Sequence, residues 1–175
     1  MAIVRATNPS KADRQIGLNS VEGLIAALQA AKLYTLPLDV YNVAEFLGLE
    51  VAEELMSDDI SGYLELKNGR WVIGVNRLHH RNRQRFTIAH EIAHYALHRQ
   101  YETNFVDQTF ARRENDTSSM EREADRFAAQ LLMPRDKVVS LIDAGKTSLE
   151  ELASSFQVST LAIRFRVKDL GYGVK

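Results

Sequence analysis

Apolar residues recur at helical spacing soon after the start of the chain, in the stretch SVEGLIAALQAAKLY. These apolar positions share one helix face: Leu24, Ala27, Leu28 and Ala31. Ser20 precedes them, and its hydroxyl is suited to cap the first turn. The pattern predicts a helix that begins directly after Ser20. Residues 1–19 are polar with little periodicity, which predicts a flexible N-terminal tail.

A second helical pattern covers LDVYNVAEFLG, and a short strand is expected after it. Gly48 stands where a helix C-terminal cap belongs. Two apolar-rich runs then flank the polar stretch KNGR within residues 60–76. Asn68 and Gly69 both tolerate positive φ, so this pair predicts a β-hairpin.

The second half of the chain is dominated by helical patterns. One helix is predicted over residues 82–98, followed by a polar connection through residue 118 with no clear period. The stretch SSMEREADRFAAQLLM predicts another helix, which Pro134 ends. Three short helices are expected after it, with Gly145 and Gly171 as stops.

Together these elements predict an α+β fold, mostly helical with a small antiparallel sheet. The expected organisation is a tail over residues 1–19, a main domain over 20–133 and a C-terminal helical subdomain over 134–175 packed on it.

Composition narrows the chemistry that the chain can perform. The formal net charge of −1 gives no global attraction to nucleic acid, and the absence of cysteine excludes disulfides and thiolate metal sites. A metal site would therefore need histidine, carboxylate and water ligands. The sequence has neither a signal peptide at its start nor an apolar run of about 20 residues, so a cytoplasmic protein is expected.

The helix RFTIAHEIAHYALH carries an HExxH pattern. His90 and His94 lie one turn apart on one face, with Cβ atoms about 5–6 Å from each other, so both can reach a single ion. Glu91 is rotated by about 100° and would stand beside the ion as a general base. His98 lies about 12 Å along the axis from His90, too far to share that ion. It is expected to contact a ligand or the substrate, or to be structural.

A catalytic ion needs a third protein ligand, and the later helix offers one. A small, acidic stripe runs along this helix: Glu121, Ala124, Asp125 and Ala128. The two alanines would allow close approach to the HExxH helix. Glu121 is then favoured over Glu123 as the ligand, and Asp125 would accept a hydrogen bond from the far nitrogen of a ligating histidine.

A short HExxH motif can also arise by chance on an ordinary polar helix surface. The residues around this one are mostly apolar, which favours buried histidines or histidines in a cleft. The group that stabilises an oxyanion stays open among four residues: Tyr95, His98, Tyr101 and Asn104.

The C-terminal stretch resembles a helix-turn-helix, although Gln157 stands where glycine often makes the turn. Four basic residues follow it, against a single acidic Asp169: Arg164, Arg166, Lys168 and Lys175. DNA binding by this patch is the less favoured alternative, and packing against the core or docking of the substrate is preferred.

The paired motifs RFTIAHEIAHYALH and EREADRFAAQLLMP resemble the ImmA/IrrE family of bacterial and phage metallopeptidases, over roughly residues 20–170. The resemblance implies zincin-like active-site helices and a gluzincin-like endopeptidase. In it His90, His94 and Glu121 hold one zinc ion and Glu91 is the general base, with manganese left open as the metal. It also implies a helix-turn-helix repressor as the protein substrate, whose cleavage derepresses stress-response or mobile-element genes. The alternative is a DNA-binding or repressor-binding regulatory module with a non-catalytic metal site.

Overall fold

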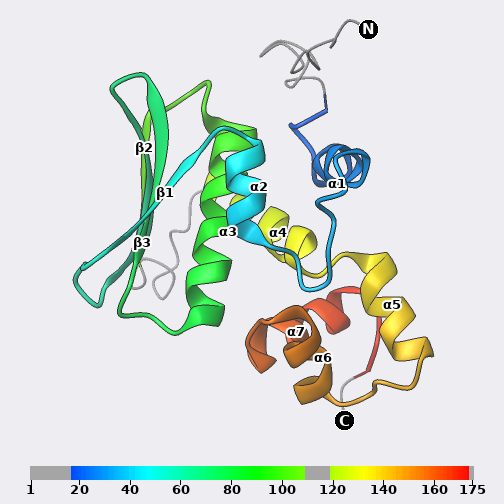
Figure 1. Ribbon diagram of the computed structural model, residues 1–175. Helices are drawn as coiled ribbons and strands as arrows, with labels where there is room; N and C mark the ends of the chain where they lie inside the picture. Colours follow the sequence, from blue (N-terminus) through cyan, green and yellow to red (C-terminus); the bar gives the residue numbers. More distant parts are fainter. Residues whose placement is uncertain (1–16, 109–118, 174–175) are drawn as a thin grey trace, which may run out of the picture.

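The computed structural model describes residues 17–108 and 119–173. Within these residues the chain forms seven helices and four strands (Figure 1). In chain order they are α1 (Val21–Ala30), α2 (Val40–Phe46), β1 (Glu50–Glu54), β2 (Ile60–Lys67), β3 (Arg70–Asn76), α3 (Arg81–His98), β4 (Asn104–Gln108), α4 (Ser119–Leu132), α5 (Arg135–Asp143), α6 (Leu149–Phe156) and α7 (Thr160–Asp169). The predicted α+β class is confirmed. Most of the predicted tail lies outside the described residues.

Local sequence signals account for most element boundaries. The Ser20 hydroxyl accepts a hydrogen bond from the Gly23 amide and caps α1, as predicted. Gly48 has φ +75° after the end of α2, and Gly145 and Gly171 have φ +93° and +90° after α5 and α7. Each takes the left-handed conformation that ends a helix. The predicted glycine stops are therefore confirmed.

The sheet has the strand order β1-β3-β2-β4. The predicted β2–β3 hairpin is confirmed, with Asn68 and Gly69 at φ 51° and 75° as a tight two-residue turn requires. The sheet is mixed, however, because β1 pairs with β3 in parallel. β3 lies between β1 and β2 in the sheet, although β1 and β2 are consecutive in the chain. The prediction of a purely antiparallel sheet is therefore wrong for β1, which runs parallel to β3.

The prediction of a connection without regular structure after α3 is wrong for residues 104–108. These residues form β4, which pairs antiparallel with β2 at the other side of the sheet. Phe105 and Asp107 are buried while Asn104 and Val106 are exposed, so the strand does alternate. Because one of its two buried residues is a carboxylate, the alternation is not hydrophobic and escapes a pattern based on apolar residues.

Helix α3 lies along one face of the sheet and packs with α4 on its other side (Figure 1). The sheet contributes Leu64, Ile73 and Val75 to the core, all fully buried. Burying one such side chain stabilises the fold by about 1.5–3 kcal/mol. Ala124 and Ala128 are fully buried in α4, and their small side chains allow the two helices to approach closely, as predicted. This approach brings the acidic residues of α4 to the histidines of α3.

Helices α5, α6 and α7 form the three short C-terminal helices that the sequence predicts. Gln157 adopts the left-handed conformation between α6 and α7, with φ 52°, where glycine is more usual. The start of α3 holds this turn: Asn82 Nδ2 donates to the Val158 carbonyl, and the Arg85 side chain donates to the carbonyls of Phe156 and Gln157. The C-terminal helices are thus tied to the helix that carries the HExxH motif.

Candidate metal centre

Helix α3 places both histidines of the HExxH motif in the interior. His90 and His94 are fully buried, or nearly so, and face the same side one helical turn apart. Their Nε2 atoms are 3.0 Å apart, and their rings meet edge to face with centroids 4.7 Å apart. Two coordinating nitrogens therefore converge on one point.

Helix α4 brings Glu121 to the same point. Glu121 Oε2 lies 3.2 Å from His90 Nε2, and Oε1 lies 3.2 Å from His94 Nε2. Donor atoms of a tetrahedral zinc site with bonds of about 2.0–2.1 Å are about 3.3 Å from one another. The three side chains form a group that can hold a metal ion, and their spacing fits that size.

Asp125, one turn further along α4, contacts the other side of His90. Asp125 Oδ1 lies 2.9 Å from His90 Nδ1, and a carboxylate accepts the proton of that nitrogen. In the neutral ring the proton is then fixed on Nδ1, which leaves the lone pair of Nε2 directed at the convergence point. The hydrogen bond predicted for Asp125 is present.

His98, which in turn contacts Glu123, lies against the outer nitrogen of His94. His98 Nε2 lies 3.2 Å from Glu123 Oε2, and His98 Nδ1 lies 3.0 Å from His94 Nδ1. If His98 donates to the carboxylate, its Nδ1 accepts from His94, and the His94 Nε2 lone pair also faces the convergence point. His98 therefore contacts a candidate ligand, one of the roles expected for it. Glu123 reaches His98 and not the Nε2 atoms, so the structure separates its position from that of Glu121.

Strand β4 adds two residues that sequence reasoning missed. The Phe105 ring stacks on His94, with centroids 4.5 Å apart and planes inclined by 22°. Asp107 is buried, and its carboxylate belongs with His90 and Glu91 to a second group whose ligand atoms lie within 4.8 Å of one another. Glu91 is fully buried on α3. The site is thus formed by α3, α4 and β4.

The other candidates for oxyanion stabilisation lie in different surroundings. The Tyr95 ring packs edge to face against Trp71, with centroids 5.9 Å apart, and beneath the Arg99 guanidinium. Tyr101 is exposed beyond the end of α3, and Asn104 is exposed at the start of β4. Of these four residues, all within the described part of the chain, His98 is the one whose side chain contacts a histidine of the HExxH motif.

Burial and the surrounding carboxylates set the charge of the site. Burial by itself disfavours a charged imidazole, but hydrogen bonds to Asp125 and Glu121 outweigh it and raise the pKa of His90 to about 10. Burial lowers the pKa of His94. Burial also opposes ionisation of Glu121, yet its hydrogen bonds to the two histidines hold its pKa well below the usual range. Without a metal, the three converging side chains therefore hold one proton between them, on His90.

The raised pKa of His90 predicts how the metal-free chain responds to pH. Because the fold binds this proton more tightly than the unfolded chain, its stabilising effect is complete below pH 6.5 and is lost as pH rises toward about 10. The melting temperature of chelator-treated protein should fall across this interval. The pKa of His94 is lowered, so its titration affects stability below this pH interval and not within it. A melting temperature that stays level or rises from pH 6.5 to 10 would contradict the assignment.

Replacing Asp125 with alanine is expected to weaken metal binding by roughly 10–100-fold, the usual effect of removing the carboxylate behind a ligating histidine. The His90 ring then loses the partner that fixes its tautomer. The affinity is measured by competition with a chromogenic zinc chelator. Asp143→Ala, which removes an exposed carboxylate at the end of α5, is the matched control and should bind as the parent does. Equal affinity in both variants would disprove the role of Asp125.

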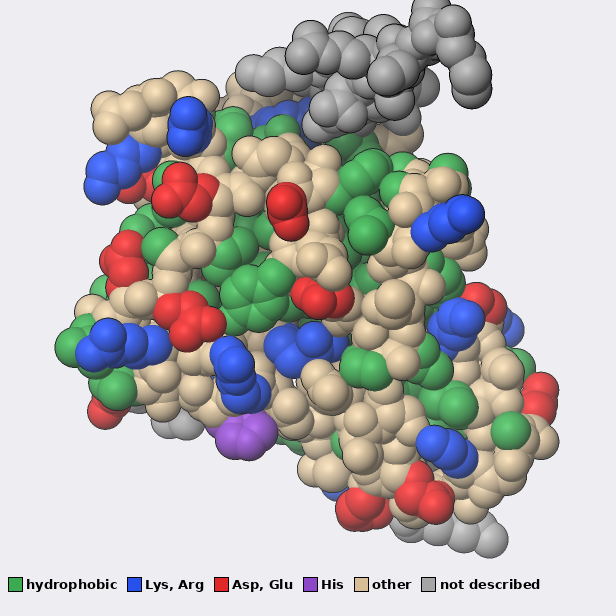
Figure 2. Space-filling model, viewed as in Figure 1, with side chains coloured by type: hydrophobic (Ala, Val, Ile, Leu, Met, Phe, Trp, Pro, Cys, Tyr) green, Lys and Arg blue, Asp and Glu red, His purple; other side chains and the backbone are tan. Residues whose placement is uncertain are grey.

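The predicted basic patch near the C-terminus is only partly available. Arg166 is 7% exposed, donating to the Met133 carbonyl and to Asp169, and therefore is held in the structure. Arg164 and Lys168 are exposed, and Lys175 lies outside the described residues. On the face drawn in Figure 2, acidic and basic side chains are interspersed.

Among the helices of the described residues, none has the length and apolar character that a membrane span requires.

Comparison with known proteins agrees with this site. The model of a peptidase family, described as the IrrE N-terminal-like domain, matches residues 44–168. The matched region includes α3, β4 and α4, and hence every residue of the convergence point. No match was found among curated proteins. The match covers more than half of the chain, and the protein therefore belongs to the ImmA/IrrE family of metallopeptidases.

Proposed function

We propose that the chain is a zinc-dependent endopeptidase whose ion is held by His90, His94 and Glu121. The observation that carries this proposal is the convergence of two histidine nitrogens and one carboxylate at 3.0–3.2 Å from one another. Two histidines and a glutamate form a usual ligand set of catalytic zinc, with the fourth position left for water or substrate. Family membership supports the same assignment.

The ion, when bound, supplies Lewis acidity, which acidifies water and polarises a peptide carbonyl. Glu91 follows His90 on α3 and is the proposed general base: its carboxylate accepts a proton from the attacking water and then donates it to the leaving nitrogen. Asp125 holds the His90 ring, and His98 with Phe105 holds the His94 ring. These contacts keep the two Nε2 atoms oriented during the reaction.

The proposed substrate is a transcriptional repressor of the helix-turn-helix type, whose cleavage derepresses stress-response or mobile-element genes. A peptidase family implies a protein substrate, and the choice of a repressor rests on the resemblance of the paired motifs to ImmA/IrrE proteins. A repressor of this kind works in the cytoplasm, where we propose that the chain acts.

The substrate class is tested by mapping new protein N-termini in cells of the source organism. Cells that produce the parent chain are compared with cells that produce the Glu91→Gln variant. We expect new termini within a helix-turn-helix repressor in the parent cells only. Identical sets of termini in the two strains would refute proteolysis, whereas new termini confined to other protein classes would refute the repressor.

A further inference from the structure

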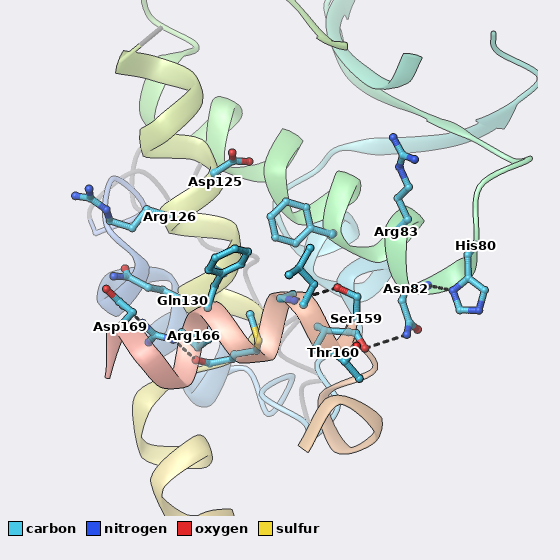
Figure 3. Close-up of a pocket in the computed structure, with 17 residues that line it drawn as sticks. His80, Asn82, Arg83, Asp125, Arg126, Gln130, Ser159, Thr160, Arg166 and Asp169 are labelled. Carbon is cyan, nitrogen blue, oxygen red and sulfur yellow. Dashed lines mark hydrogen bonds and ion pairs between the residues drawn. The ribbon is translucent and has the colours of Figure 1, made fainter. Parts of the chain in front are cut away.

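A large groove lies beside the metal centre, between α4 and α7, and the start of α3 closes one end (Figure 3). Its volume is about 1140 Å³. Asp125 belongs both to the groove wall and to the hydrogen bond with His90. Helix α4 therefore carries metal-site residues in its first half and groove residues from Asp125 to its end. Anything seated in the groove lies beside the metal centre.

The α7 side of the groove presents an apolar row to solvent. Leu161 and Phe165, one helical turn apart, are 59% and 64% exposed, and both line the groove. Phe86 and Met133 add apolar surface from the other elements. Large apolar side chains at this exposure, gathered in one concave surface, are typical of a binding site for another molecule.

Basic side chains surround this apolar row. Arg126 lines the α4 wall of the groove. Arg164 and Lys168 are exposed on α7 next to the apolar row, outside the groove lining itself. None of the three forms an ion pair within the part of the chain that the structure describes. The acidic residues of the groove are already engaged, since Asp169 binds Arg166 and Asp125 binds His90. The unbalanced charge around the groove is positive.

The same features argue against α7 as a helix that reads DNA. Base edges are read mainly by polar side chains on the exposed face of a recognition helix. Here Leu161 and Phe165 occupy the middle of that face, with Arg164 and Lys168 at its side, and Arg166 is buried and bound to Asp169. An apolar row beside a basic row instead complements an amphipathic helix that has apolar anchors one turn apart and acidic residues on its flank.

We infer that this groove is a docking site for an acidic amphipathic helix of the protein substrate, separate from the residues that hold the metal and cleave the peptide. The inference rests on the proposed function only in taking the docked protein to be the substrate. Leu161 and Phe165 receive the apolar anchors of the helix, and Arg126, Arg164 and Lys168 attract its acidic flank. Docking beside the metal centre would raise the local concentration of the scissile segment.

The test measures binding without cleavage, using the full chain with the Glu91→Gln substitution. The probes are two fluorescent helical peptides of about 16 residues with the same leucine row, one flanked by glutamate and the other by lysine. A 20-base-pair DNA duplex is the third probe. Fluorescence anisotropy should show the glutamate peptide binding at least about tenfold more tightly than the lysine peptide, because charge complementarity selects the partner.

Substitutions locate the binding surface. The double variant Leu161→Ser/Phe165→Ser should lose at least about tenfold in affinity for the glutamate peptide, as expected for two exposed apolar anchors. Leu55→Ser, which removes a leucine 62% exposed outside the groove, is the control and should leave the affinity unchanged. Circular dichroism confirms that both variants fold.

Several results would overturn the inference. These are the absence of peptide binding, a preference for the lysine peptide, an equal affinity in the double variant, and duplex binding that is lost in the double variant while peptide binding is not. Self-association of the chain through Leu161 and Phe165, detected by light scattering, would also overturn it. Because no cleavage is measured, each of these results leaves the proposed peptidase activity standing.

Discussion

Replacing Glu91 with glutamine is expected to lower the rate constant of peptide hydrolysis by about 10²–10⁴-fold, while the chain keeps its metal. Glutamine has nearly the same shape as glutamate but cannot accept the proton of the attacking water, so the loss is that of general base catalysis. Glu91 is fully buried next to His90 in the sequence and is not part of the His90, His94 and Glu121 group. The rate is measured on the proposed repressor substrate or on a peptide that spans its cleavage site.

The control for this variant is its metal content. Parent and Glu91→Gln protein should bind the same amount of zinc per chain by mass spectrometry, with the same affinity within a few-fold. A regulatory module with a non-catalytic metal site gives a different result: because binding needs no general base, Glu91→Gln would then preserve its function in cells. Full hydrolytic activity of the variant would remove Glu91 from the mechanism.

Replacing Glu121 with alanine is expected to weaken zinc binding by more than about 100-fold, beyond the 10–100-fold usual for residues that only support a ligand. The change deletes one of three converging donors and leaves two histidine nitrogens 3.0 Å apart without an anionic partner. Peptide hydrolysis should disappear with the metal at physiological zinc concentrations. Zinc affinity is measured by competition with a chelator, and hydrolysis is measured on the same preparations.

Glu123→Ala is the matched control, because it removes the same side chain two residues along the same helix. Its carboxylate is mostly exposed and contacts His98 and neither Nε2 atom, so zinc affinity should change by less than about tenfold. Loss of zinc in Glu123→Ala with retention in Glu121→Ala would reverse the assignment of the third ligand. Retention in both variants would exclude a glutamate of α4 from the site.

The convergence of α3 and α4 could be predicted from the sequence because it depends on local periodicity. Spacing of four on a helix places His90 with His94, and it places Glu121 with Asp125. Ala124 and Ala128, on the same stripe as the acidic residues, indicate close packing, and the structure has that packing. Two short sequence patterns were therefore enough to predict which side chains meet.

The contribution of β4 could not be predicted in the same way. Phe105 and Asp107 reach the site through pairing of β4 with β2, about forty residues earlier in the chain. Strand pairing over such a distance has no local signature, and β4 lacks a hydrophobic alternation. The signal that could have been followed is the spacing of Phe105 and Asp107, which places both on one face of a short extended segment.

The basic patch shows a different limit of sequence reasoning. Counting arginines treats each of them as available to a partner. Arg166 is not available, because its guanidinium donates to the Met133 carbonyl and to Asp169. Conversely, the apolar Leu161 is predicted from the sequence to lie in the core, and this prediction is wrong because the residue is 59% exposed. Helix α7 has apolar residues on two sides, so periodicity does not indicate which side faces the interior. That choice is made by the packing of α7 against α6 and α4.

The most direct test of the metal centre is anomalous diffraction at the zinc edge from crystals of the zinc-loaded chain. We expect a single strong peak about 2.0–2.2 Å from His90 Nε2, His94 Nε2 and a Glu121 carboxylate oxygen. A peak coordinated instead by His90, Glu91 and Asp107, the second group of potential ligands, would contradict both the ligand set and the role of Glu91. The absence of any peak near His90 and His94 would contradict the metal centre itself.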